Sequence, residues 1–193
     1  NIAKDLFDHV VVTSESDEIL YTAEHFYNFD VIERPSNLCK DLSTEKEFIE
    51  HVLHTYKNYR PFVEGQIFAI NEIAILYPTV PFRKLETLHR VIGHWVANKE
   101  KYNSLRTIKS VSEHPYKMFD IENNEALPFL AELEDYTAPT QSFTKYYIQV
   151  PYLYIYKVGK EKEPILPYII EDPKEGVDIN TQHDWWVAEK YLE

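Results

Sequence analysis

The chain has few glycines and almost no cysteine, and both shortages exclude kinds of site. Its 193 residues contain four glycines, and no two of these lie close enough to form a loop that cradles phosphate. Cys39 is the single cysteine, which excludes an intramolecular disulfide and fits a reducing compartment. No apolar run reaches the roughly 18 residues of a membrane span, and no secretory leader is seen. These absences predict a cytoplasmic protein without a membrane partner.

Basic residues are also in short supply, with 20 Lys and Arg against 32 Asp and Glu. The formal net charge of −12 repels polyphosphate, so the sequence predicts no nucleic-acid partner. A small anionic ligand would need a local basic pocket or a divalent cation. Apolar residues make up 44% of the chain and aromatic residues 15%, which is too much for a disordered polymer. We therefore expect one folded domain over residues 1–193.

Strand-like and helix-like patterns alternate over the first half of the chain. Continuous β-branched runs predict buried strands, and apolar residues at helical spacing predict amphipathic helices. Beyond residue 115 the strand-like segments are rich in tyrosine and separated by acidic or proline-containing loops. The pattern predicts an α/β fold with a mostly parallel sheet flanked by helices and an antiparallel excursion. The strands are expected at 7–13, 30–32, 73–77 and 105–111, and the helices at 17–26, 44–59 and 85–95. Thr44, followed three residues on by Glu47, predicts a capping box at the start of the second helix, and the sequence RPSNL after residue 33 indicates a turn.

The closing stretch VDINTQHDWWVAEKYLE, residues 177–193, admits two interpretations. The side chains of Asp178 and Asn180 lie two positions apart, which places both on one side of an extended segment, where they could face a cation. Alternatively, Thr181 and Asp184 form the start of a final helix, as a capping-box-like pair. We expect the cap whether or not a metal binds.

Four stretches carry a resemblance to a known family. The sequences VVVTSESDEIL, ILYPTVPFR, SVSEHPYKMF and VDINTQHDWWVAEKYL occur in this order and at a fitting spacing. Together they resemble the cytidylyltransferases that activate sialic acid, Kdo and related acidic sugars. The resemblance implies a Rossmann-like sheet of the nucleotide-diphospho-sugar transferase type, with residues 113–158 as an excursion that forms a homodimer and reaches the sugar side. It also implies an N-terminal strand and glycine-rich loop before residue 7, which this sequence does not contain.

The activity that this resemblance implies is transfer of CMP from CTP to an acidic sugar, with release of pyrophosphate and help from Mg²⁺. Asp178 and Asn180 would hold the metal, although the family places a second aspartate where Asn180 stands. Asp178 and Arg83 would be catalytic. The residues implied in substrate binding are Thr79, Tyr77, Lys117 and Gln141, with Tyr77 in place of a family glutamine. For Arg83 and Lys117 a solvated surface position is the alternative.

Two other functions stay open at this point. A catalytically inactive descendant that serves as a binding or assembly module is favoured by the absent glycine-rich loop and by Tyr77, Asn180, Val150 and Pro151. A metal-dependent glycosyltransferase would also use an acidic pair to hold a nucleotide sugar, although its acids usually end an internal strand.

Overall fold

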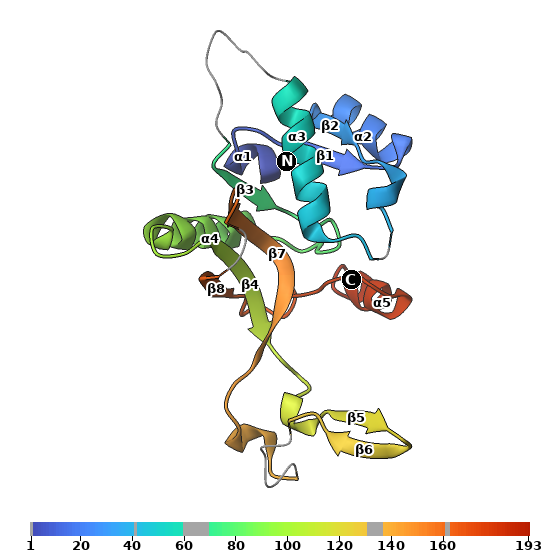
Figure 1. Ribbon diagram of the computed structural model, residues 1–193, viewed down its shortest axis with the longest axis vertical. Helices are drawn as coiled ribbons and strands as arrows, with labels where there is room; N and C mark the ends of the chain where they lie inside the picture. Colours follow the sequence, from blue (N-terminus) through green and yellow to red (C-terminus); the bar gives the residue numbers. More distant parts are fainter. Residues whose placement is uncertain (1, 41, 60–69, 131–136, 161–162) are drawn as a thin grey trace. The chain divides into compact units, whose positions relative to one another are not determined.

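The computed structural model describes residues 2–40, 42–59, 70–130, 137–160 and 163–193 (Figure 1). The chain forms two compact units, Asn1–Ala69 and Ile70–Glu193. Among the described helices, none has the length and apolar character that a bilayer crossing requires. The expectation of one domain over residues 1–193 stays a prediction.

The first unit contains the predicted strand–helix–strand arrangement. Strand β1 (Val11–Ser14) pairs in parallel with β2 (Asp30–Glu33), and α2 (Asp17–Tyr27) connects them. The Ser16 hydroxyl accepts a hydrogen bond from the Ile19 N–H at the start of α2. At its end Asn28 adopts a left-handed conformation, with φ of 51°. The remaining elements of this unit are α1 (Ile2–Leu6), a 3₁₀ turn η1 (Ser36–Leu38) and α3 (Glu45–Tyr59).

The capping box predicted before α3 is confirmed. The Thr44 N–H donates to a Glu47 carboxylate oxygen at 2.7 Å, and the Glu47 N–H donates to the Thr44 hydroxyl at 3.3 Å. The hydrogen bonds that the Glu47 carboxylate accepts from Thr44 lower its pKa. This local signal was readable from two residue types at a fixed spacing.

The second unit is built on a four-stranded sheet in the order β3-β7-β4-β8. Helix α4 packs against β7 and β8, and it buries Leu88, Val91 and Trp95. Buried residues of the sheet, including Leu105 and Leu153, complete this core. The bounds are β3 (Glu72–Ile75), α4 (Leu85–Asn98), β4 (Ser104–Ser110), β7 (Tyr147–Lys157), β8 (Ile165–Ile169) and α5 (Gln182–Lys190).

The prediction of a mostly parallel sheet is wrong. Strand β7 lies between β3 and β4 and pairs antiparallel with both, while β4 and β8 pair in parallel, so this sheet is mixed. The described residues of the connection after β4 contain no crossover α-helix, and a strand that returns without one pairs antiparallel with its neighbour. The tyrosine-rich segment therefore belongs to the sheet itself.

A proline interrupts the pairing of β7 with β4. The register shifts between Arg106 and Ile108, opposite the part of β7 that contains Pro151. Pro151 has no N–H to donate, and the ladder is irregular there. The buried Thr107 hydroxyl donates to the Val150 carbonyl at 2.7 Å and accepts from the Leu153 N–H at 3.2 Å. The carbonyls of Pro151 and Tyr152 are left for another donor.

The excursion between β4 and β7 ends in a small hairpin. Figure 1 shows β4 and β7 running side by side toward it. Strands β5 (Phe119–Glu122) and β6 (Glu125–Pro128) pair antiparallel around Asn123 and Asn124, whose φ values are 50° and 69°. The excursion also holds 3₁₀ turns η2 (Pro115–Lys117) and η3 (Thr140–Ser142), while residues 131–136 of the predicted range 113–158 lie outside the described residues.

Candidate functional site

Hydrogen bonds from Arg83 hold the turn between β3 and α4 in place. Its Nη1 donates to the Val80 carbonyl at 2.7 Å and its Nη2 to the Tyr77 carbonyl at 2.6 Å, both within the turn. The guanidinium also reaches β7, where Nη2 donates to Pro151 at 2.9 Å and Nε to Tyr152 at 2.6 Å. These are the carbonyls left open by the irregular ladder. Arg83 thus joins the turn to the sheet.

The surroundings of Arg83 change its acidity without removing its charge. Burial lowers the pKa of Arg83 to about 10, and the electrostatic influence of Tyr152 and Asp178 opposes this. The side chain stays protonated at neutral pH. Its four hydrogen bonds to main-chain carbonyls identify a structural fastening rather than a solvated residue at a helix start. Its catalytic role toward a substrate stays a prediction.

The segment before α5 lies against this turn. The Ile179 N–H donates to the Thr79 carbonyl at 2.9 Å, which joins the two stretches that the sequence singled out. The Asn180 amide donates to Asp178 Oδ2 at 2.9 Å, so the two side chains do lie on one side of the segment. Asp178 Oδ1 is buried and has no hydrogen-bond partner. At this junction of the turn with the segment before α5, one carboxylate oxygen therefore has no hydrogen-bond partner within the protein.

The helix-cap interpretation of the closing stretch is confirmed. The Thr181 hydroxyl accepts from the Asp184 N–H at 3.2 Å, and Asp184 Oδ2 accepts from the Thr181 N–H at 2.7 Å. The same oxygen accepts from the Asn180 N–H at 3.1 Å. The hydrogen bond from the Thr181 side chain, followed by those from the two main-chain groups, lowers the pKa of Asp184. The hydrogen bonds of the Asp184 carboxylate are thus made within the helix cap, whereas Asp178 takes no part in the cap.

The donor set at Asp178 fits a magnesium ion that is shared with a substrate. Over the described residues, no group of three or more His, Cys, Asp or Glu could enclose a metal. Mg²⁺ is usually held by one or two carboxylates, with waters and substrate phosphates as the other ligands. The unpartnered Oδ1 of Asp178 and the amide oxygen of Asn180 match that set. These two residues would hold the ion.

The other predicted substrate residues fall in two places. Tyr77 and Thr79 lie in the turn with Arg83, where the Tyr77 ring meets the Tyr154 ring edge-on with centroids 6.0 Å apart. Lys117 and Gln141 lie in the excursion, on η2 and η3. Lys117 Nζ donates to the Ala138 carbonyl at 2.7 Å, so it is bonded rather than simply solvated. The structure thus brings Tyr77 and Thr79 to Asp178 and places Lys117 and Gln141 on a different part of the unit.

A buried carboxylate supports the turn from the other side, and sequence reasoning did not identify it. Glu175 is 3% exposed; it accepts from the Thr87 hydroxyl at 3.1 Å and pairs with Lys84 Nζ at 3.2 Å. Lys84 Nζ also pairs with Asp172 at 2.6 Å, and the bonds from Asp172 and then Glu175 raise the pKa of Lys84. The contacts tie the loop before Asp178 to the start of α4.

The first unit contains a second polar cluster that sequence reasoning also missed. Arg34, just after β2, donates from Nη2 to the Thr13 carbonyl of β1 at 2.7 Å. The Nε of Arg34 and the hydroxyl of Thr13 are buried without hydrogen-bond partners. Ligands in open α/β sheets bind at the carboxyl ends of strands, where both residues lie. The signal was the arginine directly after a strand, in the sequence RPSNL, which had been interpreted only as a turn.

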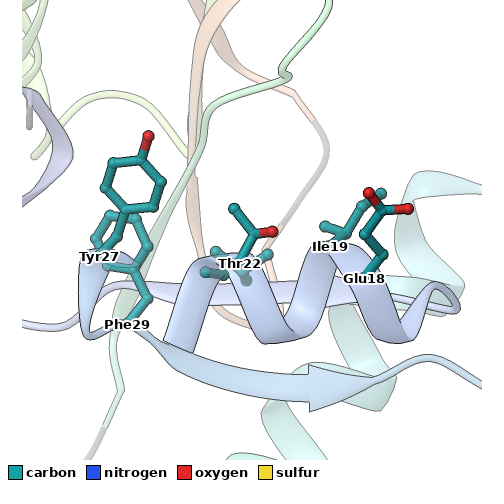
Figure 2. A pocket seen from close by; sticks show the side chains of 7 residues that line it. Glu18, Ile19, Thr22, Tyr27 and Phe29 are labelled. Carbon is teal, nitrogen blue, oxygen red and sulfur yellow. The ribbon is translucent and has the colours of Figure 1, made fainter. Parts of the chain in front are cut away.

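Another hollow lies in the first unit, beside α2. It has a volume of about 350 Å³ and is lined mainly by apolar groups of α2 and its neighbours. Figure 2 shows Glu18, Ile19, Thr22, Tyr27 and Phe29 spread along one side of α2. One carboxylate and one hydroxyl do not make a convergent polar set, so we assign this hollow no chemistry.

Comparison with known proteins finds two similar curated proteins. No known protein-family model matches the chain. It is 34% identical over 82 residues to N-acylneuraminate cytidylyltransferase of Escherichia coli, a match that spans 42% of this chain and 17% of that protein. It is 28% identical to CMP-N,N'-diacetyllegionaminic acid synthase of Legionella pneumophila, over 96% of this chain and 78% of that protein.

A solved structure shows the same fold. The 4-diphosphocytidyl-2C-methyl-D-erythritol synthase of Anaerococcus prevotii superposes with a TM-score of 0.50 at 11% identity, over 96% of this chain and 82% of that one. At this identity the likeness concerns the fold alone, and it supports a mixed α/β fold.

Proposed function

We propose that this chain, which is similar to N-acylneuraminate cytidylyltransferase and CMP-N,N'-diacetyllegionaminic acid synthase, transfers CMP from CTP to an acidic sugar of the sialic, legionaminic, pseudaminic or Kdo type. The carrying observation is the hydrogen bond from the Ile179 N–H to the Thr79 carbonyl. It holds the free carboxylate oxygen of Asp178 beside the turn that contains Tyr77 and Thr79.

The proposed reaction is phosphoryl transfer, in which an oxygen of the sugar forms a bond to the α-phosphorus of CTP. The bond between that phosphorus and the bridging oxygen breaks, pyrophosphate leaves, and the sugar hydroxyl loses its proton. When bound, Mg²⁺ would neutralise charge that develops on the phosphates. The chain's own residues chiefly orient the reactants, which is the main source of rate in such reactions.

Each residue of the junction has a distinct part in this proposal. Asp178 and Asn180 would hold the metal. The Thr79 hydroxyl makes no hydrogen bond within the described part of the chain, and it would meet a polar group of a substrate. Arg83 keeps the turn in place through its bonds to main-chain carbonyls. The first unit, taken by itself, offers Arg34 Nε and the Thr13 hydroxyl to polar atoms of a ligand, since both are buried and unpartnered.

The excursion supports a proposal about assembly. A two-stranded hairpin is barely stable alone, and this one leaves Ile121 74% and Phe129 63% exposed. We infer a homodimer in which a second copy covers these side chains. Lys117 and Gln141 lie in the same excursion and would reach the substrate in that assembly.

A second function is supported by the Asn180 side chain. It replaces one carboxylate of the expected pair with an amide that donates to Asp178 Oδ2. Two carboxylates could not form that bond, and the exchange removes a negative charge that would attract a cation. A catalytically inactive binding or assembly module would need no stronger metal site than this.

Pyrophosphate release separates the two functions. The protein from its natural reading frame is incubated with CTP, Mg²⁺ and one of N-acetylneuraminic acid, N,N'-diacetyllegionaminic acid, pseudaminic acid or Kdo. We expect release with at least one sugar and its loss in Asp178→Ala. CTP at 100 times its Kd should add about 2.7 kcal/mol to the free energy of unfolding. Absence of both turnover and CTP-dependent stabilisation would favour the inactive module.

A further inference from the structure

An open hollow lies at the start of α5, directly after the residues proposed to hold the metal. Its volume is about 240 Å³, and it is lined by Ile179, Asn180, Thr181, Gln182 and Trp185. Trp185 is the large side chain of this set, and its side chain is 52% exposed. It takes part in no ring pair or hydrogen bond of its side chain within the described residues. Tryptophan usually buries its large apolar surface, so an open indole beside a candidate site needs an explanation.

The cap of α5 fixes where this indole lies. The Trp185 N–H donates to the Thr181 carbonyl at 3.1 Å, which makes it part of the first helical turn. Helical side chains lean toward the N-terminus of their helix, so the indole extends over that turn and toward Asn180. The capping box holds the same turn rigid. A ring held on a rigid turn offers its face to a ligand at little cost in conformational entropy.

The charges around the hollow restrict what the indole could contact. The Asp184 carboxylate occupies the N–H groups at the helix start, where an anion would otherwise bind. Asp178 adds a second negative charge beside it. The exposed Gln182 side chain makes no hydrogen bond within the described residues, and its amide can both donate and accept. A neutral ring with hydroxyl groups suits this hollow, whereas a phosphate or carboxylate does not.

We propose that Trp185 is a substrate-contacting residue that determines specificity for the acidic sugar. The face of its indole packs against the C–H face of the sugar ring, and Gln182 hydrogen-bonds the ring's hydroxyl groups. The carboxylate of the sugar points away from the hollow. This inference rests on the proposed cytidylyltransferase function and extends it to the sugar side of the site.

Trp186 supplies a matched control on the same helix. It is 58% exposed, as open as Trp185, but it does not line the hollow. The third tryptophan, Trp95, is buried in the core.

The test compares Trp185→Ala, Trp185→Phe and Trp186→Ala for KM of the sugar, KM of CTP and kcat. In Trp185→Ala we expect the sugar KM to rise about tenfold, the size of one well-packed aromatic contact, with the CTP KM unchanged. Trp185→Phe should recover most of the loss, and Trp186→Ala should match the parent protein.

Fluorescence tests the contact without requiring turnover. In a Trp186→Phe protein, Trp185 is the one exposed tryptophan, and saturating sugar in the presence of CDP and Mg²⁺ should change its emission.

If turnover occurs but Trp185→Ala leaves the sugar KM unchanged, or Trp186→Ala raises it equally, the inference is wrong and the proposed function stands. A rise in the CTP KM instead assigns the indole to the base and also overturns the inference. If no sugar is turned over but the emission still responds to sugar, the indole contact is supported and the proposed function fails. If neither occurs, both are rejected.

Discussion

Each of the two compact units has an arginine in the segment that follows a strand, and the two arginines differ in how many of their N–H groups are hydrogen-bonded within the protein. Arg83 gives its N–H groups to the carbonyls of Val80, Tyr77, Pro151 and Tyr152. Arg34 gives one hydrogen bond to the Thr13 carbonyl and keeps a buried Nε without a partner. Its guanidinium also lies over the Phe48 ring at 5.4 Å.

The comparison separates a residue whose hydrogen bonds hold the structure together from a residue that keeps a polar group unpaired and able to bind a ligand. A buried donor without a partner carries a desolvation penalty of about 1–3 kcal/mol, which a ligand acceptor could remove. The same contrast holds between two acids, because Glu175 is paired inside the protein whereas Asp178 keeps one buried oxygen unpaired. The sequence motifs identified Arg83 and Asp178 as candidate site residues. Of the two arginines and two acids compared, those that keep a buried polar atom without a hydrogen-bond partner in the structure are Arg34 and Asp178.

The largest expected effect is on stability, from Arg83→Ala. This change removes four charge-assisted hydrogen bonds and leaves main-chain carbonyls unpaired, so we expect a loss of about 3–5 kcal/mol in the free energy of unfolding. Urea unfolding measures it. Arg83→Lys should recover less than half, since an ammonium cannot reproduce the planar fork. A loss below about 1 kcal/mol would break the comparison by showing that Arg83 is not a fastening residue.

Glu175→Ala should destabilise less. It removes the acceptor for Thr87 and one of the two acidic partners of Lys84, but Asp172 still pairs with Lys84. We expect a loss of about 1–3 kcal/mol, measured by thermal and urea unfolding. Glu193→Ala, which alters an exposed contact with Lys190, is the matched control and should change little. Equal effects of the two changes would contradict the assignment of Glu175 to the support of the turn.

Arg34→Ala should change ligand response more than stability. The protein loses one hydrogen bond and one cation–π contact, about 1 kcal/mol, whereas the Kd for CTP should rise by about tenfold or more. CTP titrations followed by the melting temperature measure both quantities. Thr13→Val, which removes the buried hydroxyl of the same cluster, should leave stability within about 0.5 kcal/mol. An unchanged Kd for CTP in Arg34→Ala would assign Arg34 to structure, as for Arg83.

The smallest effect is expected at the exposed cap of α5, as a pH dependence. Hydrogen bonds from Thr181 and Asn180 lower the pKa of Asp184, so its contribution to stability is fully present above the unfolded-state value of about 3.9. That contribution is lost as the pH falls through the lower, folded-state pKa. Asp184→Asn should therefore melt below the parent protein at pH 7, and the difference should close in strong acid. A difference that persists unchanged to pH 2 would contradict this account.

The helix caps and the strand–helix–strand unit could be predicted from sequence because their causes are local. Thr44 with Glu47 and Thr181 with Asp184 carry capping chemistry within three residues. The mixed sheet could not be predicted in the same way, because the place of β7 depends on pairing with strands far away in sequence. An alternating pattern shows that a segment is a strand but does not show its neighbours.

The candidate site was predicted in its components and not in their contacts. The spacing of Asp178 and Asn180 correctly placed both side chains together. The partners of Arg83 on β7 lie 68 and 69 residues further along the chain, and no local pattern identifies them. Arg34 was missed for the opposite reason, because the neighbouring proline and serine gave a sufficient local explanation as a turn. Its buried, unpaired Nε is visible only in the folded structure.

The hydrogen bond from Ile179 to Thr79 also bears on the order in which the protein becomes competent. The turn emerges from the ribosome well before β7, and β7 emerges before the segment that contains Asp178. Contacts of such long sequence separation form late, since the intervening chain must be ordered first. A nascent chain therefore carries a turn that lacks its partners on β7 until β7 is made, and lacks Asp178 until the segment before α5 is made. Translation that stops early would yield a protein with most of its sheet and none of this junction.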